Sequence, residues 1–352
     1  PAAMAACAAA TAPLAGCGLG GVCAEDAGVC ECRAGWAASG FGLEPGARRC
    51  SLHISTVRAI RYAACTGCAF YFVLSLLGVV RRFCIDSTGA SHVRRTRIVL
   101  EAVHGMCYVY PYMSLALQPD RAVLSDVPET TFAMLGIVLS SLLVYIQLSK
   151  FVNFQHRRVA AAEMRVTRSV GIGSSGSHNA SVAAPDAKLP SSGFFTLVGC
   201  IIAAELIPIL WLVAQGEVLD DVVKTFFFVQ AFTQLSFAVL SYVSLRPFAR
   251  TYLNIVKLLS DRNPELHAKL CAARKKVLAG QYRIMTTCSM FSLLMLVGNI
   301  VPGLYHAWQD YIFPAMVFYN ALIHSVHIFP SAARSAKYLV TEVSYSSSVL
   351  KR

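Results

Sequence analysis

The chain has 352 residues and a composition unlike that of a water-soluble protein. Hydrophobic residues make up 56% of it and charged residues only 14%, whereas a soluble domain usually carries about 25% charged residues. So few charges cannot cover a surface that faces water, which excludes a soluble globular fold for most of the chain, and disorder, collagen and coiled coil with it. The net charge of +12 comes from 31 Lys and Arg against 19 Asp and Glu, and their positions matter more than their sum.

In chain order, the first feature is a cluster of cysteines. Six of the 13 lie in the first fifty residues: Cys7, Cys17, Cys23, Cys30, Cys32 and Cys50. This density predicts a small module held by disulfides, which needs an oxidising compartment. A zinc knuckle is the alternative, with His53 as the nearest histidine. The alanine-rich residues 1–16 are also typical of a leader remnant, and residues 51–61 are predicted to be a juxtamembrane linker.

The cysteine spacing is C-x9-C-x5-C-x6-C-x-C-x17-C, and Gly35 and Trp36 follow the fifth cysteine. This pattern over residues 7–50 resembles an epidermal-growth-factor-like (EGF-like) module, although the last loop is longer than usual for that family. The resemblance implies an extracellular head that binds a protein or a glycan, with disulfides that pair as Cys7–Cys23, Cys17–Cys30 and Cys32–Cys50. The acidic residues that bind calcium in some members are missing before Cys7, so no calcium site is expected.

Seven stretches after the head have the length and apolar character of bilayer-spanning helices, which need about 20 mostly apolar residues. Five of them contain no charged residue: 62–80, 130–148, 225–245, 284–305 and 311–333. Two more, 98–117 and 194–214, contain one glutamate each. Because none of these runs has a polar face for water, they predict an all-α membrane protein with a seven-transmembrane helix bundle over residues 62–333.

Lysine and arginine in the loops set the orientation. Residues 81–97, 150–192, 246–283 and the tail after Ala333 hold 24 of the 31 basic residues, and all four segments fall on one side of the bundle. The sequence therefore predicts an extracellular N-terminus and a cytoplasmic tail at 334–352, in the plasma membrane. Arg58 and Arg61 are exceptions to this rule, because they precede the first span and so lie on the predicted extracellular side. The basic residues then mark the cytoplasmic side of the membrane and attract anionic lipid headgroups, so nucleic acid is not an expected partner.

Two of these cytoplasmic segments differ in character. Residues 155–193 are rich in Gly, Ser and Ala without periodicity, and they predict a flexible loop. Residues 246–283 alternate apolar with basic residues, which favours helical extensions that lie on the membrane surface or bind a cytosolic partner. A solvated basic loop is the alternative for the second segment.

Polar residues within the spans are candidate functional residues, because charged groups in lipid are costly. The candidates are Glu101, His104, Glu205, Asn299, Asn320, His324 and His327. Glu101 and His104 share a helical face, as do Asn320, His324 and His327. These side chains could line one cavity or act only as hydrogen-bonding contacts between helices.

The overall layout resembles that of G-protein-coupled receptors, without their span motifs, and also that of the plant tobamovirus-multiplication-type seven-span family. We therefore expect a receptor-like protein, with no catalytic residues, metal or cofactor. The first alternative is an intramembrane metal-dependent hydrolase, whose candidate metal ligands are Glu101, His104, Glu205, His324 and His327. The histidines of the last span resemble those of alkaline-ceramidase-like hydrolases, although the spacing here is His324-x-x-His327, with Asn320 where that family has the earlier histidine and no matching Asp. A transporter is the second alternative, although no internal repeat supports it.

Overall fold

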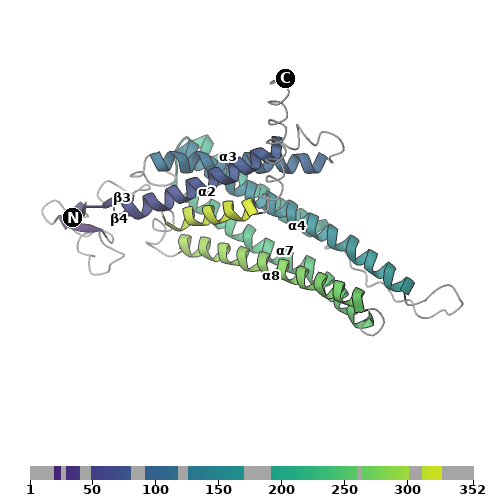
Figure 1. Ribbon diagram of the computed structural model, residues 1–352. Coiled ribbons are helices and arrows are strands. Elements are labelled where there is room, and N and C mark those ends of the chain that lie inside the picture. The colour runs from purple at the N-terminus through teal and green to yellow at the C-terminus, as the bar shows by residue number, and fades with distance from the viewer. Residues whose placement is uncertain are drawn as a thin grey trace, which may run out of the picture. The chain divides into compact units, whose positions relative to one another are not determined.

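The computed structural model describes residues 20–24, 29–39, 49–80, 92–117, 126–169, 192–259, 264–300 and 311–326, and these are mostly helical (Figure 1). The chain divides into two compact units. Unit 1 comprises residues 1–143, 206–227 and 296–352, and unit 2 comprises residues 144–205 and 228–295. Each unit is described by itself.

The head, in unit 1, consists of two small antiparallel hairpins. Strand β1 (Gly21–Ala24) pairs with β2 (Val29–Cys32), and β3 (Trp36–Ser39) pairs with β4 (Arg49–His53). The register sets Cys23 opposite Cys30 in the first hairpin. In the second hairpin an irregularity follows Ala37. Hairpins this short are marginal alone, so covalent bonds and packing against neighbours must stabilise them.

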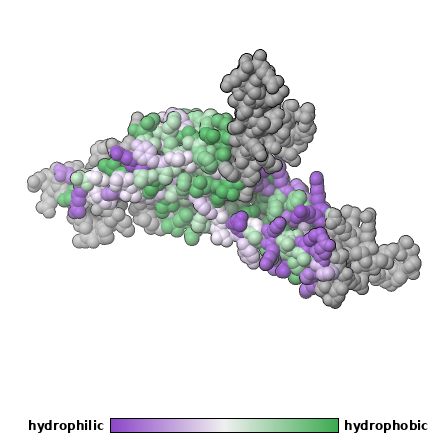
Figure 2. All heavy atoms as spheres, in the orientation of Figure 1, coloured by the Kyte–Doolittle hydropathy of each residue, from purple (hydrophilic) through white to green (hydrophobic). Residues whose placement is uncertain are grey.

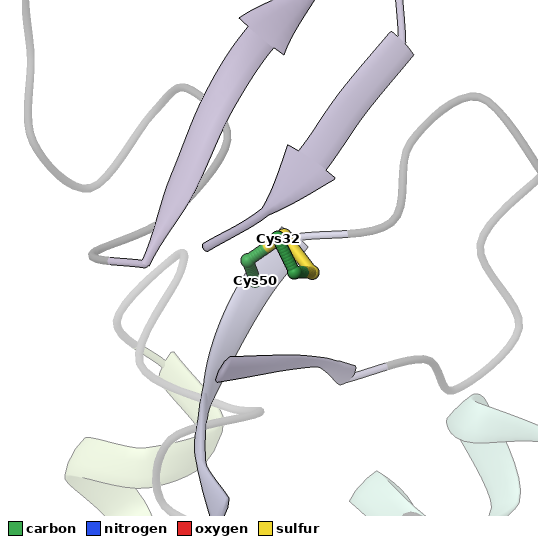
Figure 3. The surroundings of a disulfide bond; sticks show 2 residues. All are labelled: Cys32 and Cys50. Carbon is green, nitrogen blue, oxygen red and sulfur yellow. A yellow bond between two sulfur atoms is a disulfide. The ribbon is translucent and has the colours of Figure 1, made fainter. Parts of the chain in front are cut away.

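One disulfide joins the two hairpins within the described part of the head. Cys32 ends β2 and Cys50 lies in β4, and their sulfur atoms are bonded with the Cα atoms 5.2 Å apart (Figure 3). This is one of the three pairs implied by the EGF-like resemblance. The other two involve Cys7 and Cys17, which lie outside the described residues.

The turn between β2 and β3 explains the glycine in the cysteine motif. Gly35 has a φ of 84°, a left-handed conformation that a residue with a Cβ adopts only with strain. Its carbonyl oxygen accepts a hydrogen bond from the backbone nitrogen of Ile54 at 2.9 Å. The Trp36 ring packs edge-on against His53, with ring centroids 5.1 Å apart, and lies over Gly20, where a Cβ would overlap it.

Helices make up the rest of the described chain. They are α2 (Ile54–Val80), α3 (His92–Leu117), α4 (Val127–Ser169), α5 (Ser192–Ala204), α6 (Leu206–Gln215), α7 (Asp220–Leu259), α8 (Pro264–Ile300) and a further helix (Phe313–Val326), which is yellow in Figure 1 and which we call the 313–326 helix.

Five of the described helical segments are long and apolar enough to cross a bilayer: Ile54–Val80, Val127–Ala161, Phe195–Gln215, Asp221–Lys257 and His267–Ile300. The predicted helical, membrane-type architecture is confirmed to that extent. The other two predicted spans, 98–117 and 311–333, correspond to α3 and the 313–326 helix. The first carries more polar residues and the second is shorter, so the count of seven spans stays a prediction.

The described helices bury several polar residues among apolar ones and expose many large apolar side chains. On α3, His104 is fully buried and Glu101 nearly so, whereas Met113 is 51% exposed. On α6, Leu210 and Trp211 are 67% and 56% exposed. Figure 2 shows this apolar surface in green over much of the helical region. Exposed apolar area costs about 25 cal/mol per Å² in water but nothing in hydrocarbon, which is why this arrangement suits lipid.

Three predicted boundaries change in the structure. Residues 51–61, predicted to be a linker, are the end of β4 and the first turns of α2. The predicted flexible loop 155–193 is helical up to Ser169, because its first residues are good helix formers such as Ala, Glu, Met and Arg. The predicted span 194–214 is interrupted at Glu205, between α5 and α6.

The interruption at Glu205 has a local cause. Pro208 has no backbone N–H to donate to the carbonyl of Ala204, so the regular helical ladder is broken there. The backbone nitrogen of Glu205 instead bonds to the carbonyl of Ile202 at 3.2 Å, which is a tighter turn. At the other end of α6, Gly216 has a φ of 70° and ends the helix.

Candidate functional site

The candidate site is a group of buried polar side chains in unit 1, at the centre of which two histidine rings meet. His104 comes from α3 and His324 from the 313–326 helix, and their ring centroids are 5.0 Å apart at 71°. Neither ring reaches the surface, since the residues are 0% and 2% exposed. The Tyr71 hydroxyl on α2 lies 2.8 Å from His104 Nδ1. Three helices therefore meet at this pair.

A second set of hydrogen bonds adjoins the histidines. Asn320, one turn before His324, donates from Nδ2 to the Ser140 hydroxyl at 2.7 Å and to the Tyr108 hydroxyl at 3.0 Å. Ser140 Oγ lies 3.5 Å from His324 Nε2. The Tyr108 ring is also 4.4 Å from the His104 ring, centroid to centroid. The site thus joins α2, α3, α4 and the 313–326 helix.

Small residues let these helices approach closely. A Cβ at Gly136 on α4 would lie 2.6 Å from two carbons of the Tyr108 ring, and a Cβ at Gly67 on α2 would lie 2.4 Å from the Phe318 ring. On α3, Gly105 similarly lies against Phe72 of α2, where a Cβ would be 3.0 Å from its Cα. Close contact through small residues is typical of helices packed in membranes.

The polar residues of α3 form one buried stripe along that helix. Glu101, His104, Tyr108 and Tyr112 follow each other at intervals of three or four residues, which places them on one face. All four are at most 4% exposed. We call these four residues together with Tyr71 and His324 the buried column.

Both ends of the buried column meet charged groups. At the end away from the head, Glu101 forms an ion pair with Arg97 at 2.8 Å. At the head end, the buried charged residues Arg61 of α2 and Glu129 of α4 interact electrostatically with the Tyr112 phenol, whose hydroxyl has no hydrogen-bond partner among the described residues. Arg61 is fully buried in α2, so it is an interior group rather than the loop charge that the orientation rule had counted.

Other predicted site residues lie elsewhere or fall outside the described ranges. Glu205 is fully buried in unit 2, where the helix is interrupted. Asn299 is half-buried one residue before the end of α8. His327 lies outside the described residues. Of the five residues considered as shared metal ligands, the structure therefore brings His104 and His324 together.

No group of three or more His, Cys, Asp or Glu side chains that could hold a metal ion occurs in the described part of the chain. Two imidazoles fall short of the three or four ligands that a zinc site uses. The hydrolase alternative thus gains no ligand set from the described residues.

Unit 2 contains a cluster of exposed basic side chains. The described ends of α4, α7 and α8 there, residues 150–161, 246–257 and 264–283, form what we call the basic extension. Its exposed cations are Arg157, Arg158, Arg246, Arg250, Lys257, Lys269, Lys275, Lys276 and Arg283. In Figure 2 hydrophilic residues gather around the adjoining ends of α7 and α8.

The basic extension has an interior of its own. Val152, Phe248 and Val277 are buried, one from each helix. The Tyr252 hydroxyl donates to Gln155 Oε1 at 3.2 Å, which joins α7 to α4. The predicted helical form of residues 246–283 is thus seen on both sides of the undescribed residues 260–263, with the apolar stripe packed inward.

Comparison with protein-family models, with curated proteins and with solved structures finds no match to this chain. The functional interpretation therefore rests on the residues and their geometry.

Proposed function

We propose that this chain is a receptor-like protein of the plasma membrane, with seven spans, an extracellular EGF-like head and a cytoplasmic tail. The head would bind an extracellular protein or glycan. The helix bundle would transmit that binding to a cytosolic partner at the basic extension.

The observation that carries this proposal is the direct connection between the head and two helices. Strand β4 ends at His53 and α2 begins at Ile54, with no residue between them. The backbone nitrogen of His53 also donates to the Tyr311 hydroxyl at 2.8 Å, just before the 313–326 helix. A flexible linker would absorb a movement of the head, whereas this junction would pass it to both helices.

The same two helices supply three residues of the candidate site. Tyr71 lies on α2, and Asn320 and His324 lie on the 313–326 helix. A shift of either helix would change the bond between Tyr71 and His104 or the bonds between Asn320, Ser140 and Tyr108. Packed interiors of this kind switch between discrete arrangements instead of deforming smoothly, so the site suits a relay.

The basic extension supports the cytosolic end of the proposal. Its exposed charges are nearly all positive, as expected for the cytoplasmic side of a membrane protein. Lys257 near the end of α7 and Lys269 near the start of α8 are both exposed. At 1.5 Å per residue, Lys257 is about 17 Å along the helix from Arg246, so the exposed cations of α7 extend over about three turns and offer a cytosolic partner an extended basic surface.

The test of coupling uses a flexible insertion. A Gly-Ser-Gly-Ser segment placed between His53 and Ile54 should increase backbone hydrogen exchange in the 313–326 helix and around Tyr71, measured on the purified full chain by mass spectrometry. The matched control is the same insertion before Gly20, which precedes the head strands and should leave exchange in both helices unchanged.

Unchanged exchange in the 313–326 helix after the first insertion would contradict coupling through the junction. The cytosolic role is tested separately by deleting residues 252–279 and assaying the recruitment of cytosolic proteins to the chain in cells. Recruitment equal to that of the intact chain would exclude this segment as the partner site.

A further inference from the structure

A feature that the receptor proposal does not use is the acid–base chemistry of the buried column. Its members are a carboxyl group, three phenols and two imidazoles, and every one of them can exchange a proton. Ionisable side chains inside a membrane are costly, and chains of acidic residues and histidines are a usual form of proton path. Contacts between helices need only neutral hydrogen-bonding groups, such as Ser, Thr, Asn, Gln or a neutral His.

The column is long enough to connect two polar regions. Glu101 and Tyr112 are eleven residues apart on α3, which is about 17 Å along the axis. Arg97, paired with Glu101, has a side chain that is 27% exposed and so reaches the surface. At the other end Glu129 lies in the first turn of α4, next to the exposed Asp126. These end groups extend the path toward the full thickness of about 30 Å.

The centre of the column contains a hydrogen bond along which a proton can be transferred, with a second imidazole beside it. The hydroxyl of Tyr71 lies 2.8 Å from His104 Nδ1, and the His324 ring is 5.0 Å from the His104 ring and 5.7 Å from the Tyr71 ring, so the three rings contact one another. His104 Nε2 is buried and has no hydrogen-bond partner among the described residues. A buried hydrogen bond that is not made costs about 1–3 kcal/mol, so most buried ring nitrogens have a partner. An imidazole with one nitrogen held and one open can instead take up a proton and release it.

Aromatic and neutral polar groups surround the two imidazoles. Besides each other, the two imidazoles face the Tyr71 ring, at 5.3 Å from His104 and 5.7 Å from His324, and the Tyr108 ring, at 4.4 Å from His104. Aromatic rings at these distances attract cations. The neighbouring α4 contributes the neutral Ser140, and the nearest carboxylate on α3, Glu101, is paired with Arg97.

We propose that the buried column conducts protons across the membrane, with the His104–His324 pair as the central relay. A proton that enters near Glu129 passes along Tyr112 and Tyr108 to the imidazole pair, and each group that accepts a proton gives one up to the next. Tyr71 and Glu101 carry it on to the side of Arg97. One proton leaves for each that enters, no bond other than those to the proton changes, and the membrane potential or a pH difference drives the flow.

The experiment measures proton flux in vesicles that contain the purified full chain. Pyranine inside the vesicles reports internal pH, and valinomycin with a potassium gradient sets an inside-negative potential. We expect the wild-type chain to acidify the interior about tenfold faster than protein-free vesicles, and His104→Gln and His324→Gln to reduce that rate about tenfold, because glutamine keeps a hydrogen bond but carries no proton. The control is His267→Gln, a histidine of the basic extension, which should conduct like the wild type.

Two results would overturn the proposal. One is a wild-type rate no greater than that of protein-free vesicles, a comparison that does not depend on whether any variant folds. The other is a wild-type rate in both glutamine variants, provided that each elutes as a monodisperse species. Because vesicles contain neither a head ligand nor a cytosolic partner, a failure here leaves the receptor proposal intact, and a failure of coupling through the head leaves this one intact.

Discussion

Replacing Gly136 by alanine should destabilise the protein through a single contact. The new Cβ would lie 2.6 Å from two ring carbons of Tyr108, whereas carbon atoms in contact normally stay about 3.5–4.0 Å apart. The ring would have to move by about 1 Å, and it is held by the 3.0 Å hydrogen bond from Asn320. Overpacking of this kind costs about 1–3 kcal/mol, and the strained hydrogen bond adds about 0.6 kcal/mol.

A matched control separates this clash from the intrinsic effect of alanine. Gly199 also lies within a helix, α5, but a Cβ there would meet nothing within 4 Å. Alanine favours a helix over glycine by about 1 kcal/mol at either site. We therefore expect Gly199→Ala to be neutral or stabilising and Gly136→Ala to be less stable than it by about 2–4 kcal/mol, the sum of the clash and the strained bond.

The assay is reversible unfolding of both variants in mixed micelles, with the free energy of unfolding as the readout. Equal stability of Gly136→Ala and Gly199→Ala would refute the packing of α4 against Tyr108, and with it the position of Tyr108 in the buried column.

Three further results are expected. Asn320→Leu removes two hydrogen bonds and should cost about 1–2 kcal/mol of unfolding free energy, whereas Asn254→Leu, at an exposed site on α7, should change it by less than about 0.5 kcal/mol; equal effects would contradict the hydrogen bonds of the site. Cys50→Ser opens a disulfide that spans 18 residues and should destabilise the head by about 3 kcal/mol, seen as faster proteolysis of residues 20–53; an unchanged rate would show that the bond does not hold the head. The hydrogen bond from Lys269 lowers the pKa of the Glu265 carboxyl below its ordinary 4.5, so this exposed pair is present at neutral pH and is lost as the pH falls through the lowered pKa. An NMR titration of Glu265 at or above its ordinary value would contradict that pairing.

The helical architecture was largely predictable from the sequence. Long segments without charged residues are suited to lipid rather than to water, and in lipid they must form helices to satisfy their backbone hydrogen bonds. The shared face of Glu101 and His104, and that of Asn320 and His324, followed from helical spacing alone. Periodicity gives only the faces of single helices, however. Which faces meet depends on packing between helices, so helical spacing does not determine that His104 approaches His324.

Tyr71, Tyr108 and Ser140 were missed because tyrosine and serine are common in spans and give no signal of their own. Tyr108 was the easiest of the three to predict, because it follows His104 by four residues and therefore shares its helical face. Arg61 was misplaced because the orientation rule counts charges along the chain and cannot tell a buried arginine from one in a loop. The helical end of α4 was likewise missed because the glycine- and serine-rich residues after 170 dominated the composition of the predicted loop.

The most direct measurement concerns the two sides of the membrane. In cells that express the full chain, one epitope is placed between β3 and β4 and another after Arg352, and Asn179-Ala-Ser181 serves as a natural glycosylation acceptor. We expect antibody to label the head on intact cells and the tail only after permeabilisation, with Asn179 unmodified. Labelling of both epitopes on intact cells, or a glycan on Asn179, would contradict an odd number of spans with the head outside.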